Sequence, residues 1–156
     1  MRNEDPELAE LRSRETRDPD PNEVAVTLRE TSGYNGISMN REWSGNYDKA
    51  NYDARSDELA GGSANGTGSI SGVIAHEYGH VVENHLRATG QFDEIAIEVQ
   101  QTFDLGPLLV SSEVSAYARK SEQELFAEAF AEYQMMDHPR PFAERIGKLV
   151  DEKFNG

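Results

Sequence analysis

The chain has 156 residues, of which 29 are acidic and 15 are basic, and its formal net charge is −14. Such a charge makes contact with nucleic-acid phosphates unfavourable, so we expect no nucleic-acid partner. Because there is no cysteine, disulfides and thiolate ligands are excluded, and any metal must be held by histidine, aspartate or glutamate.

The N-terminal segment, residues 1–22, is charged and contains three of the six prolines. We interpret it as a flexible or linker segment that precedes a single domain at 23–156. It lacks the apolar core of a signal peptide, and no apolar run approaches the length of a membrane span. The sequence therefore predicts a soluble chain with no membrane partner, either cytoplasmic or delivered as an effector.

Two short β-prone segments come next, at 24–28 (VAVTL) and 36–39 (GISM). The residues between them include glycine and asparagine and suit a turn, so we expect two neighbouring strands. Residues 41–71 are rich in Gly, Ser, Asn and Asp, which predicts a long loop. Our preferred interpretation of this loop is a functional flap. A disordered stretch is the second alternative, and an unrecognised helix or strand is the third.

The segment 72–88 (GVIAHEYGHVVENHLRA) predicts an amphipathic helix, with Ser71 as its cap. Plotted at about 100° per residue, its apolar side chains form one stripe. That stripe consists of Ile74, Tyr78, Val81, Val82 and Leu86.

The rest of the chain also favours helices. Residues 93–103 alternate in part like a strand, but helix is the preferred interpretation, and 108–119 predict a short helix or turn. Residues 121–136 predict a strong helix, and 142–154 an amphipathic one after two prolines. Its expected buried stripe consists of Phe142, Ile146, Leu149, Val150 and Phe154. A small N-terminal β element followed by helices places the fold in the α+β class.

His76 and His80 lie four residues apart within HEYGH. On a helix this spacing puts both imidazoles on one face, where they can reach the same ion. Glu77 lies beside them, in a position from which a carboxylate can accept a proton from zinc-bound water and return it to a leaving amine. Catalytic zinc normally has three protein ligands, so the pattern requires a third elsewhere in the chain. His85 falls on the opposite side of the helix, which favours packing over ligation.

Three glutamates, Glu124, Glu128 and Glu132, follow one another at i, i+4 spacing in the helix 121–136. Like charges on adjacent turns repel, and a bound cation would relieve that repulsion. For Glu124 a second use is open, because Ser121 three residues before it makes a capping-box pattern in which the carboxylate binds backbone amides. His138, beside a proline, is expected at the surface.

HEYGH followed by SAYARKSEQELFAEAF resembles the catalytic domain of anthrax lethal factor and its relatives among phage-associated and polymorphic-toxin peptidases. These are zincins in which a glutamate is the third ligand. The resemblance covers roughly residues 70–150, and Leu125 departs from it, since the family more often has Phe there. It implies a zincin-like single domain with an active-site helix and C-terminal helices.

The resemblance also assigns roles to particular residues. His76, His80 and Glu124 would bind zinc, with Glu77 as the general base. Tyr117 would donate its hydroxyl to the developing oxyanion or to the leaving group. Glu128 would orient one of the two ligand histidines, and His76 is the preferred candidate.

The function that follows is a zinc-dependent endopeptidase, with Zn²⁺ as cofactor and a protein or peptide as substrate. By analogy with the fold, residues 36–39 would be the sheet edge that binds an extended substrate. The alternative is a non-catalytic zinc-binding module, structural or inhibitory, of a phage or toxin protein. Under either interpretation the chain could be one part of a larger toxin or phage protein.

Overall fold

A computed structural model describes residues 25–28, 36–39 and 46–155 of the chain. The linker predicted at 1–22 lies outside these residues. In chain order the described elements are β1 (Ala25–Leu28), β2 (Gly36–Met39), α3 (Tyr47–Leu59), α4 (Ile70–Ala88), α5 (Asp93–Phe103), α6 (Pro107–Glu113), the 3-10 helix η2 (Tyr117–Lys120), α7 (Glu122–Met135) and α8 (Pro141–Asn155).

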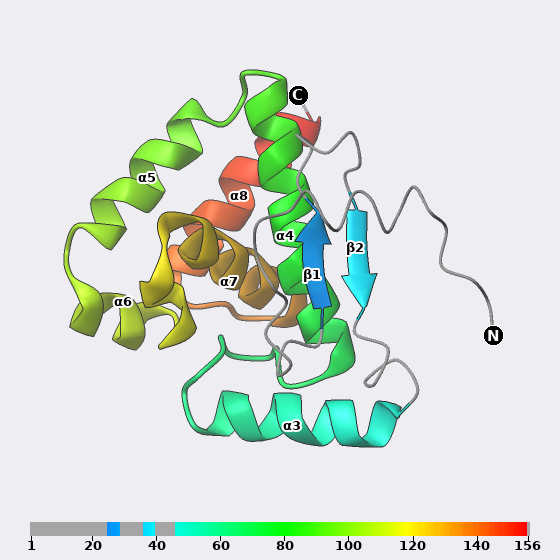
Figure 1. The fold of residues 1–156 in the computed structure, drawn as a ribbon. Coiled ribbons are helices and arrows are strands. Elements are labelled where there is room, and N and C mark those ends of the chain that lie inside the picture. The colour runs from blue at the N-terminus through cyan, green and yellow to red at the C-terminus, as the bar shows by residue number, and fades with distance from the viewer. Residues whose placement is uncertain (1–24, 29–35, 40–45, 156) are drawn as a thin grey trace.

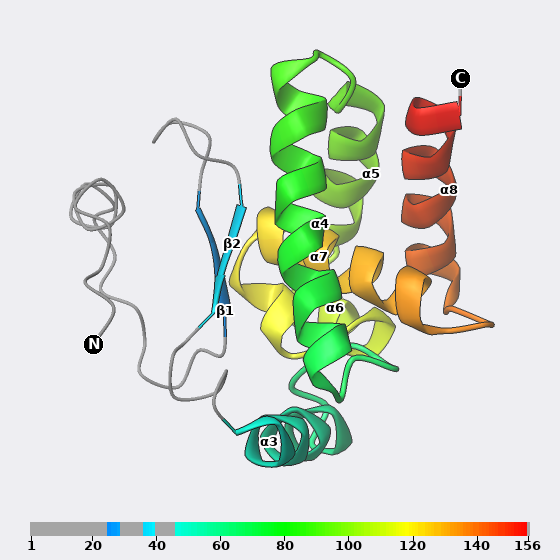
Figure 2. The ribbon, with the colours of Figure 1, turned by 90° about the vertical axis from the view of Figure 1, so that its right-hand side faces the viewer.

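Helix α7 lies against α4, α5, α8 and η2 (Figure 1). The β pair lies on one side of α4, and α5 and α8 lie on the other (Figure 2). Helix α3 runs across the end of the molecule at which α4 begins. The helix α4 is therefore the divide between the strands and the helical bundle.

The α+β fold class expected from the sequence is wrong, because the described part of the chain is helical. The two expected strands do form, and they pair antiparallel with Ala25 opposite Met39 and Leu28 opposite Gly36. They have four residues each and pair only with one another within the described ranges. Two such short strands cannot form a layer of the core, so the hydrophobic core is built by helices and the segments between them.

Helix α7 supplies the centre of the core. Every residue from 125 to 132 is buried, including two glutamates. Alanine at three of these positions allows neighbouring helices to approach closely from several sides. The buried cluster around α7 consists of Ala64, Val82, Leu86, Phe92, Ile95, Val99, Val110, Val114, Ala118, Phe142, Ala143, Ile146 and Val150, with Leu125, Phe126, Ala129 and Phe130 of α7 itself.

The loop predicted at 41–71 contains a helix, α3, that the sequence analysis did not identify. Asn46 caps it by accepting a hydrogen bond from the Lys49 amide at 3.1 Å. Its buried positions are the small residues Ala50 and Ala54, whereas its large apolar side chains are exposed. The helix therefore has no apolar stripe that a periodicity argument could detect.

Two details of α4 also differ from expectation. Its cap is Ser69, whose hydroxyl accepts from the Gly72 amide at 3.1 Å, and not Ser71. Of the predicted apolar stripe, Val82 and Leu86 are buried, but Ile74 is 41% exposed and Tyr78 is 53% exposed. The core-facing side of α4 is rotated from the predicted one.

Downstream, the helix preferred at 93–103 is confirmed as α5, and the segment 108–119 divides into α6 and η2. The predicted stripe of the last helix is confirmed at Phe142, Ile146 and Val150, whereas Phe154 is exposed. None of the described helices is both long enough and apolar enough to cross a membrane.

Candidate metal centre

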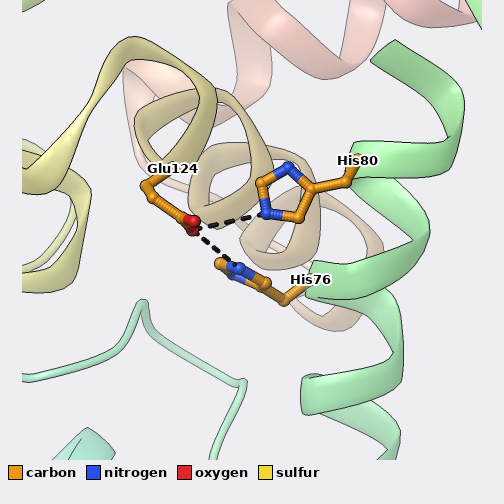
Figure 3. Close-up of side chains that lie close together, drawn as sticks. All are labelled: His76, His80 and Glu124. Carbon is orange, nitrogen blue, oxygen red and sulfur yellow. Dashed lines mark ion pairs between the residues drawn. The ribbon is translucent and has the colours of Figure 1, made fainter. Parts of the chain in front are cut away.

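His76 and His80 occupy successive turns of α4, with their ring centroids 5.0 Å apart. Both side chains are largely buried, with 12% and 17% of their surface exposed. They lie on the flank of α4 that faces α7, and Figure 3 shows both rings turned toward the start of α7. The i, i+4 spacing thus places two imidazoles side by side, as the motif predicts.

A glycine sets the distance between α4 and α7. A Cβ atom at Gly79 would lie 3.1 Å from the Cα atom of Ala127 and 3.2 Å from the Phe130 ring. Small residues on both helices therefore let the backbones come close, and this contact, rather than the largest apolar side chains, determines which side of α4 faces the core. The close approach brings the histidines of α4 within reach of the first turns of α7.

Glu124 in the first turn of α7 meets both histidines. Its Oε2 atom lies 3.0 Å from Nε2 of His76 and 3.4 Å from Nε2 of His80 (Figure 3). The helix is capped by Ser121, whose hydroxyl accepts from the Glu124 amide at 3.1 Å. Only half of the capping box forms, because Ser121 caps the Glu124 amide whereas the Glu124 carboxylate faces the imidazoles instead of a backbone amide.

The three side chains form a group that could hold a metal ion, with ligand atoms that all lie within 4.8 Å of one another. The buried Oε2 atom of Glu124 is close to both nitrogens and yet has no hydrogen-bond partner. Ligand atoms about 2.0 to 2.1 Å from a tetrahedral zinc ion lie about 3.3 Å from one another, which matches the separations of this oxygen from the two nitrogens. The residues therefore fit a metal with nitrogen and oxygen ligands.

The pKa values of His76 and Glu124 indicate that a bound metal would replace a proton on His76. Burial by itself would lower the pKa of His76, but its contacts with Glu124 and Glu128 raise that pKa to about 10. Burial would likewise raise the pKa of Glu124, but His76 and His80 hold it well below its ordinary value. Without metal, a proton on His76 is the cation that Glu124 and Glu128 share at neutral pH, and a metal ion must displace it.

Glu128 lies one turn after Glu124 and is almost fully buried. Its Oε1 atom accepts from Nδ1 of His76 at 2.6 Å, and its Oε2 atom accepts from the Ala64 amide and the Ser115 hydroxyl, each at 2.7 Å. Of the two histidines, Glu128 therefore contacts His76. A carboxylate on the far nitrogen of a ligand histidine fixes the orientation of the ring.

Tyr117 begins η2, and its ring lies beside that of His76, with the two ring centroids 5.7 Å apart. Its backbone amide donates to the Gly62 carbonyl at 2.9 Å. The ammonium group of Lys120 lies 3.9 Å from the centre of the Tyr117 ring. The tyrosine is thus held beside the histidine pair by its backbone and by a cation on its face.

The remaining candidates divide into those near the group and those away from it. Glu77 follows His76 on α4 and is buried. His85 stacks on Phe154, with ring centroids 5.9 Å apart, and lies outside the group, as expected for a packing residue. It is exposed, however, and does not lie on a buried face. His138 is exposed, as predicted. Glu132, the third glutamate of the series, pairs with Arg140 instead.

Two residues that the sequence did not indicate, Ser115 and Ala64, donate hydrogen bonds to Glu128. Ser115 falls in the segment assigned to one short helix or turn, and Ala64 in the presumed loop. A serine and a backbone amide carry no sequence signal of their own, and their contacts with Glu128 span 13 and 64 residues of chain. Only the folded chain brings them together.

No family model, curated protein or solved structure matches this chain.

Proposed function

We propose that the protein is a zinc-dependent endopeptidase. The observation that supports this most directly is the convergence of Nε2 of His76, Nε2 of His80 and Oε2 of Glu124. Two imidazoles and one carboxylate are a donor set found in catalytic zinc sites, in which a fourth position is left for water or substrate. The resemblance of HEYGH and of SAYARKSEQELFAEAF to the lethal factor catalytic domain supports the same reading.

Zinc bound in this way supplies a Lewis acid and activates a water molecule at neutral pH. In the proposed reaction Glu77 takes a proton from the water that attacks the scissile carbonyl carbon. When the carbon–nitrogen bond breaks, Glu77 delivers that proton to the leaving amine. The burial of Glu77 next to His76 supports this role.

Two other residues assist in the proposal. Tyr117, beside His76, donates its hydroxyl hydrogen to the oxyanion that forms on the carbonyl oxygen. Glu128 keeps the His76 ring oriented through the bond to Nδ1. The substrate class, a protein or peptide, and a place within a larger toxin or phage protein rest on the motif resemblance.

The test compares the zinc-loaded wild type with Glu77→Gln on a complex protein library, with new N-termini identified by mass spectrometry. We expect site-specific cleavage by the wild type and a loss of about 100- to 10,000-fold in the variant, with zinc still bound. Glu122→Gln, on α7, is the matched control and should cleave like the wild type. Equal cleavage by the wild type and Glu77→Gln would contradict the proposal.

The same samples decide the alternative of a non-catalytic zinc module. With cobalt in place of zinc, an endopeptidase site should give the absorption spectrum of a metal with three protein ligands and an exchangeable water. A spectrum that indicates four protein ligands, together with no cleavage, would replace the enzyme by the structural module.

A further inference from the structure

Ser115 lies between α6 and η2, is only 1% exposed, and has both of its hydrogen-bonding functions in use. Its oxygen accepts from the Ala118 amide at 3.1 Å. A backbone amide can only donate, so this bond directs the hydroxyl hydrogen of Ser115 away from Ala118. The other partner of the hydroxyl is Oε2 of Glu128, at 2.7 Å. The hydrogen of Ser115 therefore points to Glu128.

Glu128 receives a second fixed donor on the same oxygen. The Ala64 amide, which also can only donate, lies 2.7 Å from Oε2. Because both donors use Oε2, the Oε1 atom of Glu128 is left to accept one more hydrogen. The atom that faces Oε1 is Nδ1 of His76, at 2.6 Å.

When a metal ion displaces one of the two ring hydrogens of His76, these contacts keep the other on Nδ1. With hydrogen on Nδ1, a neutral imidazole presents the lone pair of Nε2, and this is the nitrogen that lies 3.0 Å from Glu124 in the candidate metal centre. We infer that Ser115 is a positioning residue of this centre: through Glu128 it fixes the orientation and the tautomer of His76. This inference rests on the zinc site proposed above.

Backbone hydrogen bonds fix the positions of the two donors to Glu128, the Ser115 hydroxyl and the Ala64 amide, relative to each other. The amides of Ala116 and Tyr117 donate to the carbonyls of Gly61 and Gly62 at 3.0 and 2.9 Å, which ties the Ser115 segment to the segment before Ala64. Farther along the same segment, Glu58 of α3 accepts from the Gly66 amide at 2.6 Å and from the Gly68 amide at 2.9 Å.

Residues 61–64 and 115–117 therefore brace Glu128 and, through it, His76 of the candidate metal centre. His80 has no comparable support, since its only ion-pair partner among the described residues is Glu124.

The test measures zinc affinity by competition with a chromophoric chelator for the wild type, Ser115→Ala and Ser111→Ala. The last is the matched control, because the Ser111 hydroxyl belongs to the same segment and is buried without a hydrogen-bond partner. We expect about tenfold weaker zinc binding for Ser115→Ala, the lower end of the effect of lost outer partners, because Ala64 still holds Glu128. Ser111→Ala should bind like the wild type, and Ser115→Thr, which keeps the hydroxyl, should recover most of the affinity.

The second readout is the proton resonance of Nδ1–H of His76 in the zinc-loaded protein, followed by nitrogen-15 NMR. We expect this hydrogen to be present in the wild type and its resonance to shift in Ser115→Ala but not in Ser111→Ala. A role in folding alone would lower the stability of Ser115→Ala and leave both the affinity and this resonance unchanged, which would overturn the inference.

The outcomes also separate the inference from the proposed function. A wild type that binds no zinc would remove the proposed function and the inference with it. A wild type that binds zinc, with Ser115→Ala equal to Ser111→Ala, would overturn the inference alone. If Ser115→Ala does not fold, a zinc-loaded wild type in which Nδ1 of His76 carries no hydrogen would still contradict it.

Discussion

The two ends of α7 both bury glutamates, but they neutralise them differently. Near the C-terminal end, Glu132 is fully buried and pairs with Arg140, whose Nη2 atom lies 2.6 Å from Oε2. The same guanidinium donates to the carbonyls of Val114 and Ser112 at 2.6 and 3.2 Å. Because arginine keeps its charge at any ordinary pH, this end is a permanent structural joint.

At the N-terminal end, the partners of Glu124 and Glu128 are imidazoles. In the described part of the chain neither glutamate has an ion pair with arginine or lysine. An imidazole can exchange its proton for a metal ion, whereas a guanidinium cannot. One helix thus carries one carboxylate, Glu132, that forms a joint with arginine and two carboxylates, Glu124 and Glu128, that face imidazoles in the candidate metal centre.

The largest expected effect comes from removing the cation at the structural end. Arg140→Ala leaves Glu132 buried and unpaired, which should lower the free energy of unfolding by about 3–5 kcal/mol. Zinc affinity of the folded variant should fall by less than the roughly tenfold loss expected for Ser115→Ala, because Arg140 reaches the centre only through the Val114 carbonyl, one residue before Ser115. Urea unfolding and chelator competition measure the two quantities.

The control for this experiment is Arg145→Ala. Arg145 is exposed and lies 3.6 Å from Glu98, so its loss should change stability by less than about 1 kcal/mol. If Arg140→Ala weakened zinc binding as much as a change in the centre itself, the division of α7 into two independent ends would be wrong.

The next effect is that of Glu128→Gln at the metal end. Three donors converge on Glu128, and glutamine can accept them with only one oxygen, so at least one donor loses its partner. We expect zinc affinity to fall by about 10- to 100-fold. Glu122→Gln, in the first turn of the same helix, should have no such effect. Unchanged affinity in Glu128→Gln would show that the contact with His76 does not support the metal.

A smaller and graded effect is expected from pH. The pKa of His76 is raised to about 10 in the metal-free protein, so its contribution to stability is fully present below about pH 6.5 and declines as the pH rises toward 10. Zinc replaces this proton, and its affinity should rise by up to about tenfold per pH unit between pH 6.5 and 9.

The stabilisation by zinc should therefore grow with pH over this range. Melting temperatures with excess zinc and with excess chelator, compared at pH 6.5, 7.5 and 8.5, measure it. Zinc-dependent stabilisation that is constant over these values would argue that no proton is displaced from His76.

Local spacing made two of the three candidate metal ligands predictable. His76 and His80 are neighbours because of the helical repeat, and α4 and α7 were both expected as helices. The third ligand came from resemblance, since nothing local in Glu124 distinguishes a ligand from a capping residue. In the structure Ser121 caps the Glu124 amide, and the Glu124 carboxylate lies against the two imidazoles, where it could bind a metal.

The rest depended on contacts between distant segments. The side of α4 that meets α7 is set by Gly79 and Ala127, and small residues leave no mark in an apolar stripe. In the sequence, Glu132 has the same i, i+4 spacing as Glu124 and Glu128. Its partner, Arg140, lies beyond the end of α7, and only the folded chain brings the two together. The α+β class was wrong because the two expected strands, of four residues each, pair only with one another among the described residues, and helices build the core.

The central claim is that His76, His80 and Glu124 bind one metal together, and zinc content with X-ray absorption at the zinc edge tests it most directly. The protein, dialysed against a weak chelator, should retain about one zinc per chain, in a shell of two imidazoles and at least one oxygen. His80→Gln and Glu124→Gln should each lose the zinc, while His85→Gln, on the same helix as His80 but stacked on Phe154, should keep it. A wild type that retains no zinc, or Glu124→Gln that retains it in an unchanged shell, would contradict the account.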